Sequence, residues 1–414
     1  MSGRPGRAES AGRAGLIAIG ASVAGTFAVA VAGPSVMEPA LPGRPGQPPW
    51  SFGLHPSPYL AVGLTAAALA AGTVGLVLAL RAVRGGWSVP ARAVLVAGLL
   101  AAVALTLVPP FGSSDHLSYA AYGRMLVTGH NPYTTTPAQL AALGDPIARA
   151  VQDWARSPSV YGPLATAIQA LAALAGGTSV RLTVFVLGLA NLAAFAGTAL
   201  LLHRMTRGNP EWQLRAALLW AANPLLLQVL VAGAHVDSQA VVFGVAAVAV
   251  MYEARGEVSA PRAALAGALV GLGFAVKVTI ALVGLGLALA VMLRARRQPR
   301  PLWRRQWPAL AGLAAGFAVT AGAAVAIGGS AMLRQSAQAS DMVSIGSPWR
   351  VIRTIIHVAV TGTAATDLIK AGAVALAVLL AVLLIRGLEP GSAGSRTAWR
   401  SEERRVGKEC VTTC

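Results

Sequence analysis

The sequence has little charge for its length. Of its 414 residues only 12% are Asp, Glu, Lys or Arg, whereas 55% are hydrophobic. Soluble proteins carry about 25% charged residues, so the polar side chains here are too few to cover a water-soluble globule. The composition therefore excludes a soluble enzyme and predicts an all-α, polytopic membrane protein.

Cysteines and nucleotide-binding motifs are also scarce. Both cysteines, Cys410 and Cys414, lie close to the end of the chain, so the sequence predicts neither a disulfide framework nor a cysteine metal site. The sequence contains no P-loop and no G-x-G-x-x-G unit between a strand and a helix. ATP-driven transport and a nucleotide-sugar-binding domain therefore lack support. We expect no cofactor, and a divalent cation is not indicated.

The positive charge lies mainly between the apolar runs. The net charge is +18 and comes mostly from arginine. Arginine clusters that alternate with apolar runs are typical of the cytoplasmic side of a membrane protein, so we interpret them as a signal of topology. We expect membrane lipids, and not nucleic acid, among the partners. The composition changes abruptly at residues 401–414, which we interpret as a non-native tail without function.

Apolar runs long enough to cross a bilayer core of roughly 30 Å predict about ten transmembrane helices. The first run, 14–33, lacks an A-x-A cleavage site, and we interpret it as a membrane span and not a signal peptide. The stretch 263–293 is too long for one crossing, so we expect two short spans with a break near Lys277. The remaining spans are expected at 58–81, 91–108, 179–202, 215–233, 238–253, 308–328 and 367–386.

The arginines also predict an orientation. If the N-terminus is cytoplasmic, the arginine-rich loops 82–90, 203–214 and 294–307 all fall inside, as the positive-inside rule requires. This holds only if the short apolar segment 163–175 does not cross the membrane completely, and its length suits a re-entrant or interfacial helix. We therefore expect one membrane-embedded domain, 1–400. Its outer loops are expected at 109–162 and 329–366.

Polar residues gather in the first expected outer loop and at the ends of other spans on the same side. Asp115 follows the Pro109-Pro110 break, where a carboxylate can cap a helix or act on a substrate. We expect a helix from Leu117 to Thr128 and an amphipathic helix from about Thr136 to Trp154 on the bilayer surface. Polar residues at membrane depth mark functional sites. The further candidates for substrate binding are His116, Tyr119, Arg124, Asn131, Tyr133, Tyr161, His235, Asp237 and Lys277.

Lys277 lies inside an apolar stretch, where a charged lysine costs about 2.5–3.5 kcal/mol. It either reaches the interface by snorkelling or has an anionic partner, for which a lipid phosphate and Asp237 are the candidates. His235 and Asp237 are two residues apart and cannot share a helix face, but on a turn both can face one cavity. Asp237 can equally be a helix start. The pair supplies too few ligands for a metal site.

Short motifs follow one another along residues 90–300. They are SDHLSYAAYGR at 114–124, GHNPY at 129–133, YGPL at 161–164, NPL at 223–225 and GAHVD at 233–237. In order and spacing these motifs resemble those of the polyprenol-phosphomannose-dependent α-1,6-mannosyltransferases, an actinobacterial family of the GT-C class. The chain departs from the family pattern at Val236, where Asn is usual.

The resemblance implies a GT-C-like hexosyltransferase of the cell membrane with its active site outside. It implies transfer of mannose from a polyprenyl-phosphate donor to a cell-envelope glycan or lipoglycan, with inversion. Asp115 would be the base, and because the leaving phosphate is already ionised one carboxylate suffices. Lys277 and Arg124 are expected to stabilise that phosphate. The alternatives are a transporter or flippase of a lipid-linked sugar and a non-catalytic subunit of envelope assembly.

Overall fold

The computed structural model describes residues 5–252, 258–296, 306–339, 348–359 and 363–388. In this part of the chain the structure is all-helical, as predicted, apart from one isolated bridge between Ser35 and Glu38. The tail 401–414 and the middle of the expected loop 329–366 lie outside the described residues. The chain forms two compact units, Met1–Ser336 and Ala337–Cys414, and each is described by itself.

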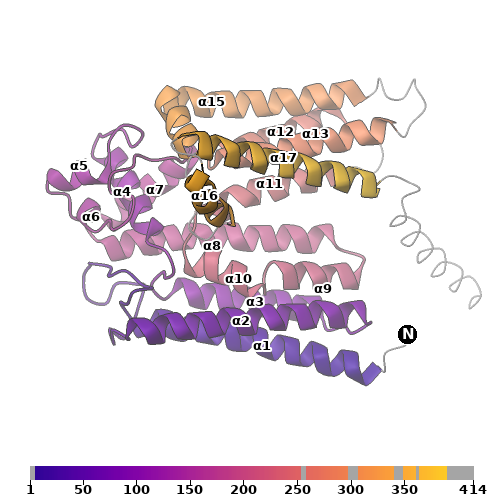
Figure 1. Cartoon of the computed structure of the whole chain (residues 1–414), viewed down its shortest axis with the longest axis horizontal. Helices are drawn as coiled ribbons and strands as arrows, with labels where there is room; N and C mark the ends of the chain where they lie inside the picture. Colours follow the sequence, from indigo (N-terminus) through magenta and orange to yellow (C-terminus); the bar gives the residue numbers. More distant parts are fainter. Residues whose placement is uncertain (1–4, 253–257, 297–305, 340–347, 360–362, 389–414) are drawn as a thin grey trace, which may run out of the picture. The chain divides into compact units, whose positions relative to one another are not determined.

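The first unit begins with three apolar helices at the predicted spans. Helix α1 (Pro5–Ala32) runs antiparallel to α2 (Pro58–Arg84), and α3 (Ala91–Thr106) follows after a short turn (Figure 1). Glycines bring α1 and α2 together. A Cβ added to Gly15 or Gly75 would lie 2.7 Å from a backbone oxygen of the other helix. Small residues permit this approach between helices in a membrane.

Short helices occupy the long loop after α3. Helix α4 (Asp115–Val127) agrees with the predicted helix, but the expected amphipathic helix from Thr136 to Trp154 is wrong. That segment forms two short helices, α5 (Pro137–Ala142) and α6 (Pro146–Arg149). Gly144 between them has a φ of 94°, and Asp145 starts α6 by accepting the N–H groups of Ile147 and Ala148.

Helix α7 (Pro163–Gly176) forms where the sequence predicted a short apolar segment at 163–175. Its 14 residues span about 21 Å, which is less than a bilayer core of roughly 30 Å. It packs against α4 and against α8 (Val180–Met205), and Gly176 lies against Thr183 in the first turns of α8. Helix α7 therefore stays at the end of the first unit that carries α4 (Figure 1).

The segment predicted as the span 215–233 contains a break. Helix α9 (Pro210–Leu219) stops at Trp220, and α10 (Pro224–Leu226) continues into the π-helical segment η1 (Leu227–Ala232). Asn223 starts α10 by accepting the N–H groups of Leu225 and Leu226. The Asn-Pro-Leu sequence is thus a helix start. Irregular backbone at membrane depth is tolerated where protein groups satisfy it.

Further apolar helices complete the described part of the first unit. Helix α11 (Asp237–Tyr252) packs against α8 and α12 (Ala260–Phe274). The predicted break near Lys277 is confirmed, because Lys277 lies between α12 and the 3₁₀ turn η2 (Val278–Ile280), which leads into α13 (Ala281–Arg296). Helix α15 (Trp307–Ala339) packs on α12 and is kinked at Gly329. The second unit contains α16 (Pro348–Ala359) and α17 (Thr363–Leu388).

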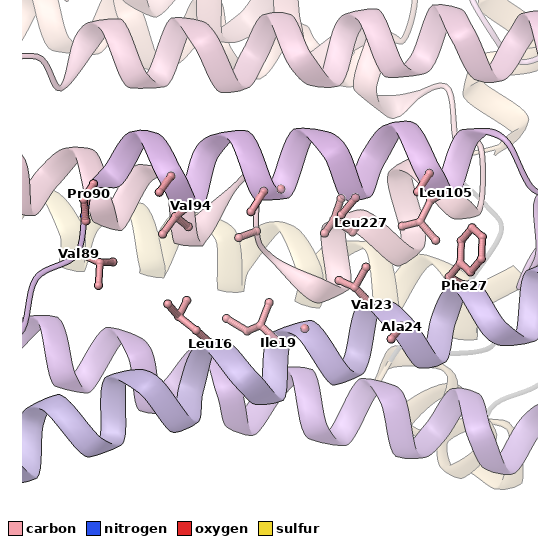
Figure 2. Close-up of a pocket in the computed structure, with 17 residues that line it drawn as sticks. Leu16, Ile19, Val23, Ala24, Phe27, Val89, Pro90, Val94, Leu105 and Leu227 are labelled. Carbon is pink, nitrogen blue, oxygen red and sulfur yellow. The ribbon is translucent and has the colours of Figure 1, made fainter.

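The described helices have the character of membrane spans. Five are long and apolar enough to cross a bilayer, and further apolar helices are shorter. An apolar cavity of about 770 Å³ lies between α1 and α3 (Figure 2), and Leu227 of η1 also contributes to its wall. These features agree with a polytopic helical membrane protein. The five long helices are Gly6–Ala32, Pro58–Arg84, Val180–Met205, Pro210–Ala232 and Trp307–Ala339.

Candidate active site

Charged and polar residues from separate parts of the first unit converge beside α4. The carboxylate of Asp115 lies 3.4 Å from Nδ1 of His235, and Lys277 Nζ pairs with Asp237 Oδ1 at 2.6 Å. His235 and Asp237 belong to the turn between η1 and α11. The structure therefore brings together Asp115 and His235, which are more than a hundred positions apart in the sequence.

Asp115 is the first residue of α4 and does not cap it. Ser114 occupies the N-cap position, and the backbone N–H of Asp115 donates to Ser113 Oγ. The capping interpretation of Asp115 is therefore wrong by one residue. Its side chain is 26% exposed and is free to contact other groups. The helix N-terminus favours a negative charge at this place.

Trp154 is a neighbour of Asp115 that the sequence did not predict. Its indole Nε1 donates a hydrogen bond to Asp115 Oδ1 at 3.0 Å. The sequence pattern placed Trp154 on a surface helix, whereas the residue lies in an irregular turn with a φ of 62°. The only sequence signal for this contact is a tryptophan within a polar loop, and local periodicity does not reveal its partner.

The turn that carries His235 is also unusual. Ala234 has a φ of 52° and is 1% exposed, so the backbone is held in a conformation that residues other than glycine rarely adopt. Such backbone strain persists where the surrounding structure holds it. Val236, which departs from the family pattern, is 2% exposed and belongs to the apolar core. The changed side chain is therefore buried.

The ion pair of Lys277 identifies its anionic partner. A lipid phosphate and Asp237 were the two candidates, and the structure shows Lys277 Nζ 2.6 Å from Asp237 Oδ1. The two side chains are 34% and 37% exposed. Water screens a pair of this exposure, so its contribution to stability is below about 1 kcal/mol, and both groups remain accessible to a ligand.

Two tyrosines line the same region. Tyr161 donates its hydroxyl hydrogen to Tyr119 at 3.2 Å, and the two rings meet edge to face with centroids 5.2 Å apart. Burial is the main cause that raises the pKa of each hydroxyl, and the negative charge of Asp115 adds to the increase. Both tyrosines therefore remain neutral hydrogen-bond donors at physiological pH.

His116 lies inside the protein. It is fully buried, and neither ring nitrogen has a hydrogen-bond partner among the described residues. Burial, followed by the charge of His235, lowers the pKa of His116 to about 3, so the ring is neutral. The structure gives His116 no exposed surface, and its expected role in substrate binding stays a prediction.

The other three predicted residues make contacts that hold the loop together. Arg124 Nε pairs with Asp145 Oδ2 at 2.7 Å, which joins α4 to the start of α6. Asn131 Oδ1 accepts the backbone N–H of Tyr133 in a turn. The Tyr133 hydroxyl bonds to Thr166 Oγ1 on α7 at 3.1 Å. The polar groups that contact Asp115 come instead from Trp154 and His235. Among the described residues no group of three or more His, Cys, Asp or Glu could hold a metal ion.

Comparison with known proteins gives consistent matches. The family model described as alpha-(1->6)-mannopyranosyltransferase, N-terminal domain, matches residues 13–296, more than half of the chain. The chain is 33% identical over 138 residues to alpha-(1->6)-mannopyranosyltransferase B of Corynebacterium glutamicum, covering 32% of this chain and 22% of that protein. It is 32% identical over 142 residues to a probable alpha-(1->6)-mannopyranosyltransferase of Mycolicibacterium smegmatis, covering 33% and 25%.

A third relative is similar to the same extent. The chain is 31% identical over 157 residues to an alpha-(1->6)-mannopyranosyltransferase of Mycobacterium tuberculosis, covering 37% of this chain and 26% of that protein. The matched part of the chain thus spans about a quarter of the length of these curated relatives. No solved structure matches the chain.

Proposed function

The chain belongs to the alpha-(1->6)-mannopyranosyltransferase family, and we propose that it transfers mannose from a polyprenyl-phosphate donor to a cell-envelope glycan or lipoglycan. The transfer inverts the anomeric carbon and takes place on the outer face of the cell membrane. The polyprenyl-phosphate sugar, the glycan acceptor and the membrane lipids are the partners in this proposal. No metal ion or cofactor is part of it.

In the proposed reaction the acceptor hydroxyl attacks the anomeric carbon of the donor mannose. The bond between that carbon and the phosphate oxygen breaks, and the electron pair leaves with the polyprenyl phosphate. The hydroxyl proton passes to the Asp115 carboxylate. The leaving phosphate is already ionised, so a second carboxyl group as general acid is not needed, in contrast to most glycosidases.

The geometry around Asp115 is the observation that carries the proposal. One carboxylate oxygen accepts the indole N–H of Trp154, and the other lies 3.4 Å from His235. A base held in this way, yet 26% exposed, can receive a proton from a bound hydroxyl. The position of Asp115 at the start of α4 also places it at an end of the helical unit, where a lipid headgroup could reach it.

Lys277 is the cation that we propose for the departing phosphate. It lies in the same region as Asp115, and its contact with Asp237 leaves both groups about a third exposed. A positive charge near the leaving oxygens stabilises the charge that develops in the transition state. Arg124, the other cation expected for this role, is engaged by Asp145 at 2.7 Å, so the phosphate role falls mainly on Lys277.

The apolar cavity between α1 and α3 suits the hydrocarbon part of the donor. Its lining is formed by aliphatic residues and Phe27, and Leu227 of η1 belongs to its wall (Figure 2). Along the chain, η1 leads through Gly233 and Ala234 to His235. A polyprenyl chain in this cavity would have its phosphate end near the charged cluster. The lipid tail would leave hydrocarbon of similar polarity when it enters the cavity, so the cavity would position the donor mainly through van der Waals packing.

The distribution of arginine supports an outer location for the site. Helix α1 begins at the end of the first unit opposite α4–α6 (Figure 1). That opposite end also carries the arginine-containing turns between α2 and α3 and between α8 and α9. The positive-inside rule assigns the arginine-rich end to the cytoplasm, and the Asp115 end then faces outside.

The first experiment measures transfer of labelled mannose from polyprenyl-phosphate mannose in membranes that contain the chain. Asp115→Asn should lower the rate about 10²–10⁴-fold, the usual contribution of a general base. Glu211→Gln is the matched control, because it makes the same carboxylate-to-amide change in a surface ion pair on α9. Full transfer by Asp115→Asn at normal expression would exclude Asp115 as the base, and no transfer by the unmodified chain would contradict mannose transfer from this donor.

A further inference from the structure

An exposed tryptophan contacts the proposed base. Trp154 is 48% exposed, and its indole N–H donates to Asp115 Oδ1 at 3.0 Å. An indole N–H can donate but cannot accept, so it fixes one oxygen of the carboxylate. The other oxygen is left toward His235. The orientation of the proposed base therefore depends on where Trp154 lies.

The turn before Trp154 is tied to the first turn of α4. Ser114 Oγ donates to Asp153 Oδ2 at 2.6 Å, and Ser118 Oγ donates to the Asp153 carbonyl at 3.2 Å. With the indole bond, these contacts join residues 114–118 to residues 153–154. The first contact is charge-assisted and therefore stronger than a bond between neutral groups. The contacts hold the tryptophan beside the base.

The backbone of Trp154 shows that this placement is enforced. Its φ of 62° lies in the left-handed region, which a bulky residue rarely adopts. Residues held in such conformations gather at active sites and ligand clamps. The strained backbone thus holds a half-exposed aromatic ring that is hydrogen-bonded to a carboxylate and leaves it a face that a ligand can contact.

We propose that Trp154 is a positioning residue for Asp115 and that its exposed ring forms one wall of the subsite for the acceptor sugar. The proposal rests on the proposed transferase function and extends it to the acceptor. The N–H orients the carboxylate that receives the hydroxyl proton. The apolar face of the ring offers a surface for the C–H groups of a sugar, in the way that aromatic side chains commonly line ligand sites.

Kinetics of two variants separate the two roles of Trp154. Trp154→Phe keeps an aromatic ring but loses the N–H, and Trp154→Ala loses both. We expect kcat to fall about tenfold in both variants, as for a lost hydrogen bond to a charged group. The KM for the acceptor should rise about fivefold or more in the Ala variant alone. Equal kcat in Trp154→Phe and the unmodified chain would overturn the positioning role.

Trp50 provides the matched control. It is also 48% exposed and donates its indole N–H, here to the Gly46 carbonyl at 3.1 Å. Trp50→Phe removes an indole hydrogen bond of similar length from a loop outside the charged cluster. We expect its kcat and acceptor KM to equal those of the unmodified chain. A drop in kcat equal to that of Trp154→Phe would mean that loss of any loop tryptophan is responsible, and would overturn the proposal.

Binding of α-1,6-linked mannotriose tests the subsite without catalysis. By calorimetry on the purified full chain in detergent, Trp154→Phe should bind within about threefold of the unmodified chain, and Trp154→Ala about tenfold or more weakly. Equal binding by Trp154→Ala, or no binding by the unmodified chain, would overturn the subsite. Binding that depends on Trp154, together with no transfer from the polyprenyl donor, would instead reject the proposed function and retain the sugar subsite.

Discussion

Two surface ion pairs of nearly equal exposure allow function to be separated from stability. The pair Lys277–Asp237 lies in the candidate site, and its side chains are 34% and 37% exposed. The pair Arg215–Glu211 lies on α9, and its side chains are 32% and 33% exposed. We expect Lys277→Met and Arg215→Met to lower the free energy of unfolding alike, by less than about 1 kcal/mol. Only Lys277→Met should lower kcat, by about 100-fold, because it removes the charge proposed to face the phosphate.

The measurement is kcat for mannose transfer together with the melting temperature of each variant in detergent. Lys277→Arg retains the positive charge and should recover part of the lost activity. If both Met variants lose activity equally, the lysine has no special role in catalysis. If Lys277→Met melts far below Arg215→Met, the pair is mainly structural.

A second residue-scale prediction concerns pH. Glu38, in the loop between α1 and α2, is 2% exposed, and burial raises the pKa of its carboxyl from 4.5 to about 8. The folded protein therefore keeps a proton that the unfolded chain releases above pH 4.5. The stability that Glu38 contributes is fully present below pH 4.5 and is lost as the pH rises through about 8.

Glu38→Gln cannot ionise and should not show this loss. The difference in melting temperature between the variant and the unmodified chain should therefore grow from pH 5 to pH 8. At pH 8 the variant should have gained on the order of a few kcal/mol in free energy of unfolding relative to the unmodified chain. Glu9→Gln, which changes an exposed carboxylate on α1, is the control. A constant difference across this range would show that Glu38 is charged in the folded protein.

At the residue scale the sequence predicted the charged residues that are unusual because they lie next to apolar segments. Asp115, Asp237 and Lys277 were found because charges are rare beside apolar runs and need partners. The structure places them together. Trp154 could not be found in this way, because its contact with Asp115 joins two parts of a loop that only tertiary structure brings into register. The ion pair of Arg124 with Asp145 in the same loop could not be predicted from the sequence either, and the expected role of Arg124 in substrate binding stays a prediction.

At the scale of elements, hydropathy predicted the helices but not their irregular ends. The predicted spans coincide with α1, α2, α8 and α15, which are long and apolar enough to cross a bilayer, and with the shorter apolar helices α3 and α11. The single helix expected from Thr136 to Trp154 failed because Gly144 and the Asp145-Pro146 pair end one helix and start another. The π-helical segment after Asn223 has no simple sequence signal, and such segments often mark functional sites.

Helix α1 offers a test of the proposed lipid cavity. Gly20 lines the cavity, and a Cβ added there would meet no atom of the described residues within 4 Å. Gly20→Phe should fold normally and occupy part of the 770 Å³. We expect the KM for the polyprenyl donor to rise about tenfold, because the phenylalanine ring takes space that the polyprenyl chain would occupy, with the KM for the acceptor unchanged. Initial rates in detergent, with the donor and the acceptor varied in turn, measure both KM values.

Gly63→Phe on α2 is the matched control, because a Cβ at Gly63 also meets open space and Gly63 does not line the cavity. Its kinetic constants should equal those of the unmodified chain. An unchanged donor KM in Gly20→Phe would place the polyprenyl chain elsewhere. An equal rise in both variants would indicate a general effect of bulky residues on these helices.

At the scale of the whole molecule, the parity of the spans determines which end faces outside. The proposed topology requires that α7, which has 14 residues, does not cross the bilayer core. Thr134 lies in the loop after α4, and Ser88 lies in the turn between α2 and α3; both side chains are exposed. The two positions therefore report on opposite ends of the first unit and should differ in accessibility.

Single cysteines test this topology directly. In a background with Cys410→Ser and Cys414→Ser, Thr134→Cys should react with a membrane-impermeant maleimide on intact cells, because its loop belongs to the Asp115 end. Ser88→Cys should react only after permeabilisation, because the positive-inside rule places the flanking Arg84 and Arg92 in the cytoplasm. The reverse pattern would place Asp115 in the cytoplasm and exclude an outer active site. Labelling of both positions on intact cells would mean that α3, the span between them, does not cross the membrane.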